Sequence, residues 1–459
     1  MMTMGKVPRR LLLTLSQLVA LVLFAGTAAA GEPRAPQPPL VLSLEKAISI
    51  ALEQNRDVLI ADQDRYKADA QVGEARSGAF PQITVTGQYT RNVAKPVLFM
   101  PPNTPFNPSH STQTFEIGSD NSFMAGVQVS QPLFSRKVGM ALDIANNYTD
   151  LSSYAFDATK QGVVLQVKKA FYSVLLARKL VEANRQGLDV VKANYENVQA
   201  QFRHGNAAEF DLLRAEVQLA NTEPLLISAE NSLVLALNAL KNLLSIPLEE
   251  EIEVQGQFTF EESSQAAMDE AARRALSTNP SILQLSLQES ILEKNISIER
   301  ANYYPTLNLV GGYQWQSQDN TFQFRNYNWA NIFNVGLSLS YPLFDGFKTS
   351  ARTQQAAIER EKIRYTRLKA EEALKILIQS SALRMAEARR RIEGQEKSID
   401  QAKKAVRIAQ TRFKSGVGTQ LELLDTQVAM TRAQTNCAQA IYDYLVARSD
   451  WEYAVGQSK

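Results

Sequence analysis

Two acidic side chains stand at a spacing that suits electrostatic work. Glu422 and Asp425 are three residues apart, just after Thr419, where a helical pattern begins. Residues three apart share one helix face, so both carboxylates point the same way. Two interpretations stay open. The pair presents negative charge to a passing solute, or Glu422 completes a capping box with Thr419 while Asp425 complements the helix N-terminus.

The remaining reactive residue types do not form a catalytic constellation. His110 lies in a proline-rich loop and His204 at a helix tip, and neither has a partner at metal-ligand spacing. Cys437 is the only cysteine, so no intrachain disulfide can form. No glycine loop suited to phosphate is present. We therefore predict a chain that is not an enzyme and that uses no metal or cofactor.

The elements that must position these residues occur twice in the chain. Three stretches of one half have a counterpart in the other: Phe202-Arg-His-Gly205 and Phe413-Lys-Ser-Gly416, Gln131-Pro-Leu-Phe134 and Tyr341-Pro-Leu-Phe344, and the segments that follow Pro81 and Pro305. Each half reads as helix, strand, loop, strand, very long helix, tight turn and helix. This predicts two structural repeats, residues 31–256 and 257–459.

Four segments alternate apolar residues with uncharged polar residues. They are residues 82–90, 123–133, 306–316 and 334–343, and they carry no charge. This pattern favours strands of a membrane β-barrel, with a soluble sheet that has one wet face as the alternative. Leu309 and Leu337 then face lipid, while Asn308 and Ser338 face a lumen. The polar, proline-containing residues 91–122 are predicted as a loop.

Four strands cannot close a barrel, and an open sheet edge in lipid leaves backbone groups unpaired. Other copies of the chain must therefore complete the sheet. Two chains would give eight strands and a filled interior, whereas three would give twelve strands and a usable lumen.

Two proline-free stretches, residues 139–202 and 346–413, predict helices of about 100 Å. Their apolar residues step by three and four near the tips, which demands a partner helix after the turn. Gly205 and Gly416 occupy positions where a left-handed residue ends a helix. Asn206 and Thr419 are each followed by glutamate three residues later, and both are predicted as N-caps.

The N-terminus predicts an exported protein, and the net charge gives no sign of nucleic-acid binding. Residues 1–30 have basic, apolar and small-residue regions in the order of a removable export signal. The chain has 49 basic and 47 acidic residues, and removing the three bases of the signal leaves 46 against 47. A nucleic-acid-binding protein would have an excess of basic residues, which this balance does not show. No later apolar run is long enough for a spanning helix.

Taken together, the duplicated order, the proline-led strands, the Pro-Leu-Phe runs and the Phe-x-x-Gly tips followed by Leu-Leu-Asp425 resemble the TolC-like outer-membrane efflux protein family. The resemblance implies an α+β membrane protein that forms a homotrimer. A twelve-stranded transmembrane β-barrel in the outer-membrane lipid, with four strands per chain, would continue into a long periplasmic α-helical barrel. The implied partners are a periplasmic adaptor (membrane fusion) protein and an inner-membrane transporter, either proton-driven or of the ABC type.

The same resemblance assigns roles to the tips. Acids at the positions of Glu422 and Asp425 ring the periplasmic aperture in the family and set its cation selectivity. Asp211 matches a further acid of the closed tip, but Phe413 and Gly418 stand where the family has a tyrosine and an arginine. A closure lock, if present, must then use other residues, with Lys414, Arg203 and Arg412 as candidates. In the first half Asp211 and Arg214 occupy the places of the acid pair and can neutralise each other.

The exposed polar residues of the tips predict a docking surface for the adaptor, formed by Arg203, Gly205, Lys414 and Gly416. The function expected is a passive outer-membrane channel that exports small compounds from a tripartite efflux pump. The alternative is the outer-membrane duct of a type I protein secretion system, and a non-channel periplasmic coiled-coil protein comes third. The exported substrate and the particular transporter stay open.

Overall fold

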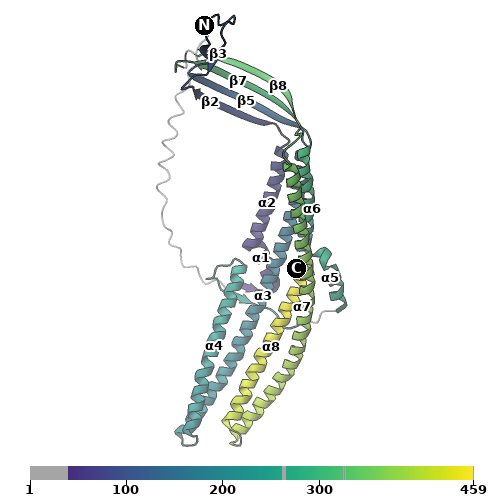
Figure 1. Cartoon of the computed structure of the whole chain (residues 1–459). Helices are drawn as coiled ribbons and strands as arrows, with labels where there is room; N and C mark the ends of the chain where they lie inside the picture. Colours follow the sequence, from purple (N-terminus) through teal and green to yellow (C-terminus); the bar gives the residue numbers. More distant parts are fainter. Residues whose placement is uncertain (1–39, 261–264, 324, 326, 458–459) are drawn as a thin grey trace, which may run out of the picture.

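The computed structural model describes residues 40–260, 265–323, 325 and 327–457. The predicted export signal, residues 1–30, lies outside this range. Two parts of very different shape make up the chain: a four-stranded sheet at one end, and a long helical bundle that runs away from it (Figure 1). None of the described helices is both long and apolar enough to cross a membrane.

The sheet is antiparallel, with the strand order β2-β5-β7-β8. Its strands are β2 (Gln82–Arg91), β5 (Asn121–Phe134), β7 (Thr306–Asp319) and β8 (Ala330–Ser340). Successive side chains point to opposite faces, and the register keeps the apolar residues together on one of them. Val127, for example, lies opposite Tyr313, which lies opposite Phe333. β2 and β8 are the edges, and every residue of both strands is exposed.

The segment predicted as a loop between the first two strands contains a hairpin of its own. β3 (Val97–Met100) pairs with β4 (Gln113–Glu116). Between them Asn107 is completely buried, and its amide nitrogen donates to the carbonyl oxygens of Met100, Pro101 and Ser111 at 3.0–3.1 Å. The loop prediction is therefore wrong for these residues. Strands of only four residues are too short to show a clear alternation of apolar and polar residues within a proline-rich stretch.

The helices below the sheet come in short and long forms. In chain order they are α1 (Leu44–Gln54), α2 (Arg56–Ser77), α3 (Arg136–Arg203), α4 (Glu209–Leu243), α5 (Gln265–Thr278), α6 (Pro280–Arg300), α7 (Lys348–Lys414) and α8 (Gln420–Ala454). A 3-10 turn, Ala301–Tyr303, joins α6 to β7. α3 has 68 residues and α7 has 67, so each runs for about 100 Å, as predicted.

Each half has two helices before its first strand of the four-stranded sheet, where the sequence pattern predicts one. Asn55 breaks the first pair, and its side-chain oxygen accepts a hydrogen bond from Asp57 N at 2.9 Å. Asn279 breaks the second pair in the same way through Ser281 N at 3.0 Å. Both asparagines thus act as N-caps, which satisfy the free amides of a new helix. Their amide groups also donate to the last turn of each half, to Leu243 O at 2.8 Å and Ala454 O at 3.2 Å.

The apolar core lies at mid-height of the bundle, where the short helices pack against the long ones (Figure 1). In the first half, Phe171 and Leu240 are buried beside a two-stranded parallel sheet of β1 (Leu40–Leu42) and β6 (Ile252–Val254). In the second half, α5 packs on a cluster that includes Ile392. Burying such side chains contributes about 1.5–3 kcal/mol each, so this level anchors both helical hairpins.

Ion pairs between α3 and α8 join the two halves near this core. Lys168 Nζ lies 2.8 Å from Glu452 Oε2, and Lys169 Nζ lies 2.5 Å from Asp450 Oδ1. Lys168 is itself buried. Below this level the α3–α4 and α7–α8 hairpins continue as two arms, each ending in its own turn (Figure 1).

Candidate functional site at the helical tips

The predicted site residues gather at the pole farthest from the sheet (Figure 1). We call residues 202–210, between α3 and α4, the first tip, and residues 413–421, between α7 and α8, the second tip. In or directly beside them lie all the predicted aperture and docking residues: Arg203, Gly205, Asp211, Lys414, Gly416, Glu422 and Asp425.

Both tips reverse the chain with the same hydrogen-bond pattern. Gly205 has φ +76° and Gly416 has φ +75°, which confirms the left-handed positions predicted for them. In the first tip, Asn206 N donates to Gln201 O at 2.8 Å, and Gly205 N donates to Phe202 O. The equivalent amides of the second tip donate to Arg412 O and Phe413 O, both at 3.1 Å. These pairs are a Schellman motif, so the glycines serve the termination of both long helices.

The two return helices begin differently. Thr419 Oγ1 accepts a hydrogen bond from Glu422 N at 3.2 Å, which confirms the predicted N-cap of α8. The matching prediction for Asn206 is wrong, because α4 begins at Glu209 and its N-cap residue is Ala208, without a side-chain hydrogen bond. The backbone amide of Asn206 is used to close the turn. Counting from the glycines, Ala208 is the counterpart of Thr419, and a methyl group cannot accept a hydrogen bond.

The second tip is also closed more tightly. Gly418 N donates to Arg412 O at 3.0 Å. A Cβ atom at Gly418 would lie 2.8 Å from Arg412 Cβ and 3.0 Å from Phe413 N. Such contacts are shorter than folded proteins tolerate, so only glycine fits here. The arginine that the resemblance led us to expect at Gly418 would therefore not fit this backbone conformation.

Of the three basic candidates for a closure lock, Arg412 makes its contacts inside its own turn. Arg412 Nε lies 3.6 Å from Glu422 Oε2, and Arg412 Nη2 donates to Val417 O at 3.4 Å. Both partners of the ion pair are about half exposed, and pairs of this kind stabilise by at most about 1 kcal/mol. The pair nevertheless places a positive charge directly beside Glu422, one of the predicted aperture acids.

The acids near the tips differ in their surroundings. Asp425 is exposed, and no hydrogen bond or ion pair involves its carboxylate in the described chain. Asp211 and Arg214 occupy the matching places of the first half and are half-buried. The described chain contains no ion pair between them. Asp425 is therefore an exposed acid without a partner, but each tip carries acidic as well as basic side chains, with Glu209 and Asp211 in the first turn of α4.

Exposed side chains surround both glycines. Arg203 and Lys414 are exposed, as a docking surface requires. The apolar residues beside them are also exposed, Phe210 at 70% and Val417 at 68%. The expectation that Phe210 packs against the preceding long helix is therefore wrong, and no role was predicted for Val417. Large apolar side chains that stay exposed often mark a contact surface. A signal was available for Val417, which lies between a helix-ending glycine and the next helix, whereas Phe210 is the second residue of α4.

Three amide side chains near the tips are buried without a hydrogen-bond partner in the described chain. They are Asn194, Gln420 and Gln427, each less than 10% exposed. Gln420 and Gln427 are seven residues apart on α8, so they occupy one helix face. An unpartnered buried amide costs roughly 1–3 kcal/mol, so these residues weaken the packing of α8 near its tip.

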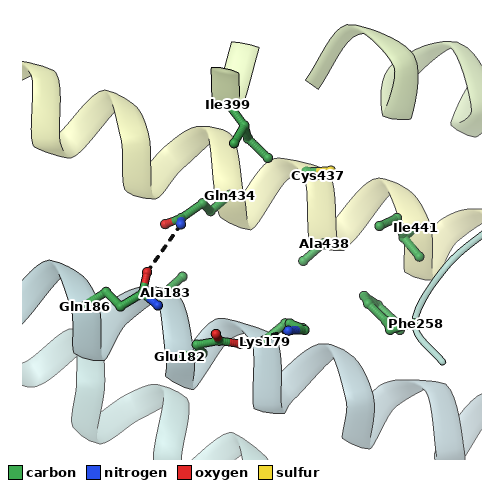
Figure 2. Close-up of a pocket in the computed structure, with 10 residues that line it drawn as sticks. All are labelled: Lys179, Glu182, Ala183, Gln186, Phe258, Ile399, Gln434, Cys437, Ala438 and Ile441. Carbon is green, nitrogen blue, oxygen red and sulfur yellow. Dashed lines mark hydrogen bonds and ion pairs between the residues drawn. The ribbon is translucent and has the colours of Figure 1, made fainter. Parts of the chain in front are cut away.

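A recess of about 220 Å³ lies higher up, between α3 and α8 (Figure 2). Gln434 Nε2 donates to Gln186 Oε1 across it at 3.4 Å, and Lys179 pairs with Glu182 on one wall. Cys437 lies on another wall, and burial, together with the nearby charge of Glu396, raises the pKa of its thiol. A thiol kept protonated in this way is a poor nucleophile.

The described residues include no group of three or more His, Cys, Asp or Glu side chains that could hold a metal ion. His110 and His204 lie at opposite poles of the molecule, in the connection between β3 and β4 and in the first tip. The chemistry of the tips is therefore one of charge, hydrogen bonding and apolar contact.

Comparison with known proteins gives a consistent result. Residues 47–245 and 271–457 match the family described as "Outer membrane efflux protein". The chain is 25% identical over 424 residues to "Outer membrane protein TolC" of Vibrio cholerae, covering 90% of each chain. It is 26% identical over 345 residues to "Alkaline protease secretion protein AprF" of Pseudomonas aeruginosa, covering 73% of this chain and 70% of that one.

The fold is also that of solved channels. The Campylobacter jejuni outer membrane channel CmeC superposes with a TM-score of 0.73 at 19% identity. The match covers 90% of this chain and 86% of that one. At this identity the likeness concerns the fold alone.

Proposed function

The chain belongs to the outer membrane efflux protein family, and we propose that three copies of it form one passive export channel with an acidic periplasmic aperture. As a member of this family it is an outer-membrane efflux channel protein with a long periplasmic helical tunnel. Proteins of the family form trimers and work with an adaptor and an inner-membrane transporter. A periplasmic coiled-coil protein without a channel has no support from this membership.

The observation that carries the assembly is the pair of open sheet edges. β2 and β8 are both unpaired on their outer sides, and one face of the sheet is apolar. In hydrocarbon each unpaired backbone group costs several kcal/mol, so β8 of one copy must pair with β2 of the next. Three copies close twelve strands around an open lumen, whereas two would close a filled barrel of eight.

The register supports the assignment of the two faces. Leu309 lies opposite Leu337 on the apolar face, which we assign to lipid. Asn308 lies opposite Ser338 on the other face, which we assign to the lumen. The lumen is thus lined by uncharged polar groups, which suits a channel that passes varied small compounds.

At the other pole, a trimer gathers six carboxylates from Glu422 and Asp425 around one opening. A ring of acids in a narrow passage attracts cations and repels anions. Arg412 offsets part of the charge of Glu422, so Asp425 supplies most of the field. Asp211 adds a further acid from the first tip, and no ion pair joins it to Arg214 in the described chain.

Single-channel recording of the reconstituted protein tests this function. We expect a cation-selective channel whose selectivity falls when Glu422 and Asp425 are both replaced by alanine. The control variant, Glu387→Ala with Asp400→Ala, removes two exposed acids of α7 away from the tip and keeps the selectivity. Native mass spectrometry in detergent must give three chains for all of these proteins. A folded monomer, or equal selectivity in all three, contradicts the proposal.

A second candidate function is the duct of a protein secretion system. It is favoured by the relative AprF, whose name assigns it to alkaline protease secretion. Both functions use the same passive tunnel, so the inner-membrane partner decides between them. Co-purification after cross-linking in the native cells separates the two, because it recovers either a proton-driven pump or an ABC exporter.

We also propose that the tips receive the adaptor. Arg203 and Lys414 beside Gly205 and Gly416 form an exposed basic surface at the end of the chain that reaches deepest into the periplasm. The exposed Phe210 and Val417 add apolar contact area to it. A helical hairpin with acidic side chains next to apolar ones has the complementary chemistry.

A further inference from the structure

The apolar face of the sheet is not uniformly filled. One row across the four strands reads Ile83, Val129, Gly311 and Val335 in paired register. The third position of this row has no side chain. A recess of about 320 Å³ opens at that point, and its walls include Val129, Leu309, Tyr313 and Val335.

The backbone around Gly311 leaves room for a side chain, so nothing in the fold requires glycine at this position. A Cβ atom built on Gly311 would meet no neighbour closer than 3.8 Å, the distance to Asn334 O. An alanine or a larger residue would therefore fit and fill the space. The recess exists because this position carries glycine between larger side chains.

The residues around the recess change from apolar to partly polar along β7. Towards the helical bundle the wall continues with Leu309 and Leu337. Towards the opposite end stand Tyr313 and Trp315, with ring centroids 4.3 Å apart, and Asn331 Nδ2 donates to the Tyr313 hydroxyl at 2.9 Å. Such aromatic residues are typical of the level where lipid headgroups meet the hydrocarbon.

We propose that this recess binds one acyl chain of a membrane lipid, with the polar end of the lipid beside Tyr313 and Asn331. The proposal rests on the barrel of the proposed function and on the assignment of this face to lipid. The acyl chain already lies in hydrocarbon within a bilayer, so the hydrophobic effect does not favour its binding. The recess attracts it because side chains surround it on several sides and supply additional van der Waals contacts.

A second copy of the protein does not fit as the occupant. The recess is centred on β7, an inner strand, whereas a neighbouring copy adds its strands beyond the edges β2 and β8. The walls are also apolar apart from Gln131 and backbone groups. A hydrocarbon chain is the occupant that matches this position and this chemistry.

Native mass spectrometry tests the proposal on trimers that have been stripped of lipid in detergent and incubated with dipalmitoyl phosphatidylethanolamine. We expect up to one firmly bound lipid per chain in the wild type. Gly311→Leu should fill the recess and lower this retention roughly tenfold. The matched control is Gly87→Leu, which adds the same side chain on the same face, at a position with no atom of the same chain within 4 Å of the new Cβ, and should retain lipid as the wild type does.

Each outcome decides. Equal retention in all three proteins overturns the proposal, and so does equal loss in both leucine variants, which would mean that lipid adheres to the whole face. If Gly311→Leu fails to assemble, Gly311→Ala takes its place and should give a smaller loss than leucine but a measurable one. A wild-type trimer with normal cation selectivity but no retained lipid refutes this inference alone. A protein that forms no trimer refutes the proposed function.

Discussion

The two tips of this chain share one way of ending a helix and differ in how the next helix begins. Both close through a left-handed glycine and the same pair of backbone hydrogen bonds. Only the second tip has a side-chain N-cap, a glycine packed against the preceding helix, and an arginine paired with an acid of the return helix. The reversal of the chain is thus common to both, while the side-chain cap, the tightly packed glycine and the ion pair belong to the second tip.

This difference suggests a division of labour. A constriction that selects ions needs its charged groups held in place, and the second tip provides Glu422 and Asp425 on a capped helix start. The first tip has Asp211 and Arg214 on a helix that begins without a cap. We therefore expect the second tip to set the properties of the aperture, and both tips to serve as contact surfaces.

Charge reversal at the docking surface should have the largest effect. Replacing Arg203 and Lys414 by glutamate is expected to abolish export in cells, because the surface then repels an acidic partner. The two single variants should lose similar amounts, since these residues occupy matching places at the ends of α3 and α7. The glutamine variants at both sites serve as controls for the loss of charge alone. Normal export with an intact trimer would move the docking surface elsewhere.

Adding a methyl group to the second tip should come next. Gly418→Ala forces its Cβ against Arg412 and Phe413, and overpacking of this kind costs about 1–3 kcal/mol. Hydrogen–deuterium exchange of the peptide that spans the second tip should become roughly tenfold faster. The reciprocal change in the first tip, Ala207→Gly, should alter exchange much less. Equal effects in the two tips would remove the distinction in packing.

The N-cap difference can be exchanged between the tips. Thr419→Ala should loosen the start of α8 by about 1 kcal/mol, because the amide of Glu422 loses its partner. Ala208→Thr should slow exchange at the start of α4 by a comparable factor. The same exchange experiment reads both. If Ala208→Thr has no effect, the first tip is loose for reasons other than its missing cap.

The smallest expected effect concerns Arg412. Arg412→Gln removes the positive charge beside Glu422 at a stability cost of at most about 1 kcal/mol, because the pair is half exposed. Cation selectivity in single-channel recordings should rise slightly. By the same argument Asp425→Ala should lower selectivity more than Glu422→Ala. The opposite order would show that Arg412 does not offset Glu422 in the assembled channel.

The sequence predicts some parts of this molecule well for identifiable reasons. Alternation without charge marks the sheet strands, and the absence of proline marks α3 and α7. The glycines of the tips and Thr419 follow local rules that need no tertiary contact. Asn206 satisfies the same spacing rule as Thr419, but it lies in the turn, two residues before the N-cap position, and only an alignment of the two tips points to Ala208.

Other features depend on contacts that spacing alone does not contain. β1 and β6 have three residues each and lie more than 200 residues apart in the chain, so only packing against the core defines them. The tight fit of Gly418 depends on the path of the Arg412 backbone. The breaks at Asn55 and Asn279 did leave a signal, since asparagine is a favoured N-cap, Asn55 is followed by Asp57 in the first turn, and Asn279 precedes a proline.

Asn55 and Asn279 also have a consequence for how the chain is built. Each one fastens the entry of its half to the carbonyl end of that half's last helix, at Leu243 and Ala454. The start and the finish of each half therefore meet at the same level of the bundle. A module whose two ends adjoin can be followed by another of its kind through a short connector, without rerouting either. Tandem copying of such a module is a simple genetic route to a long tunnel wall.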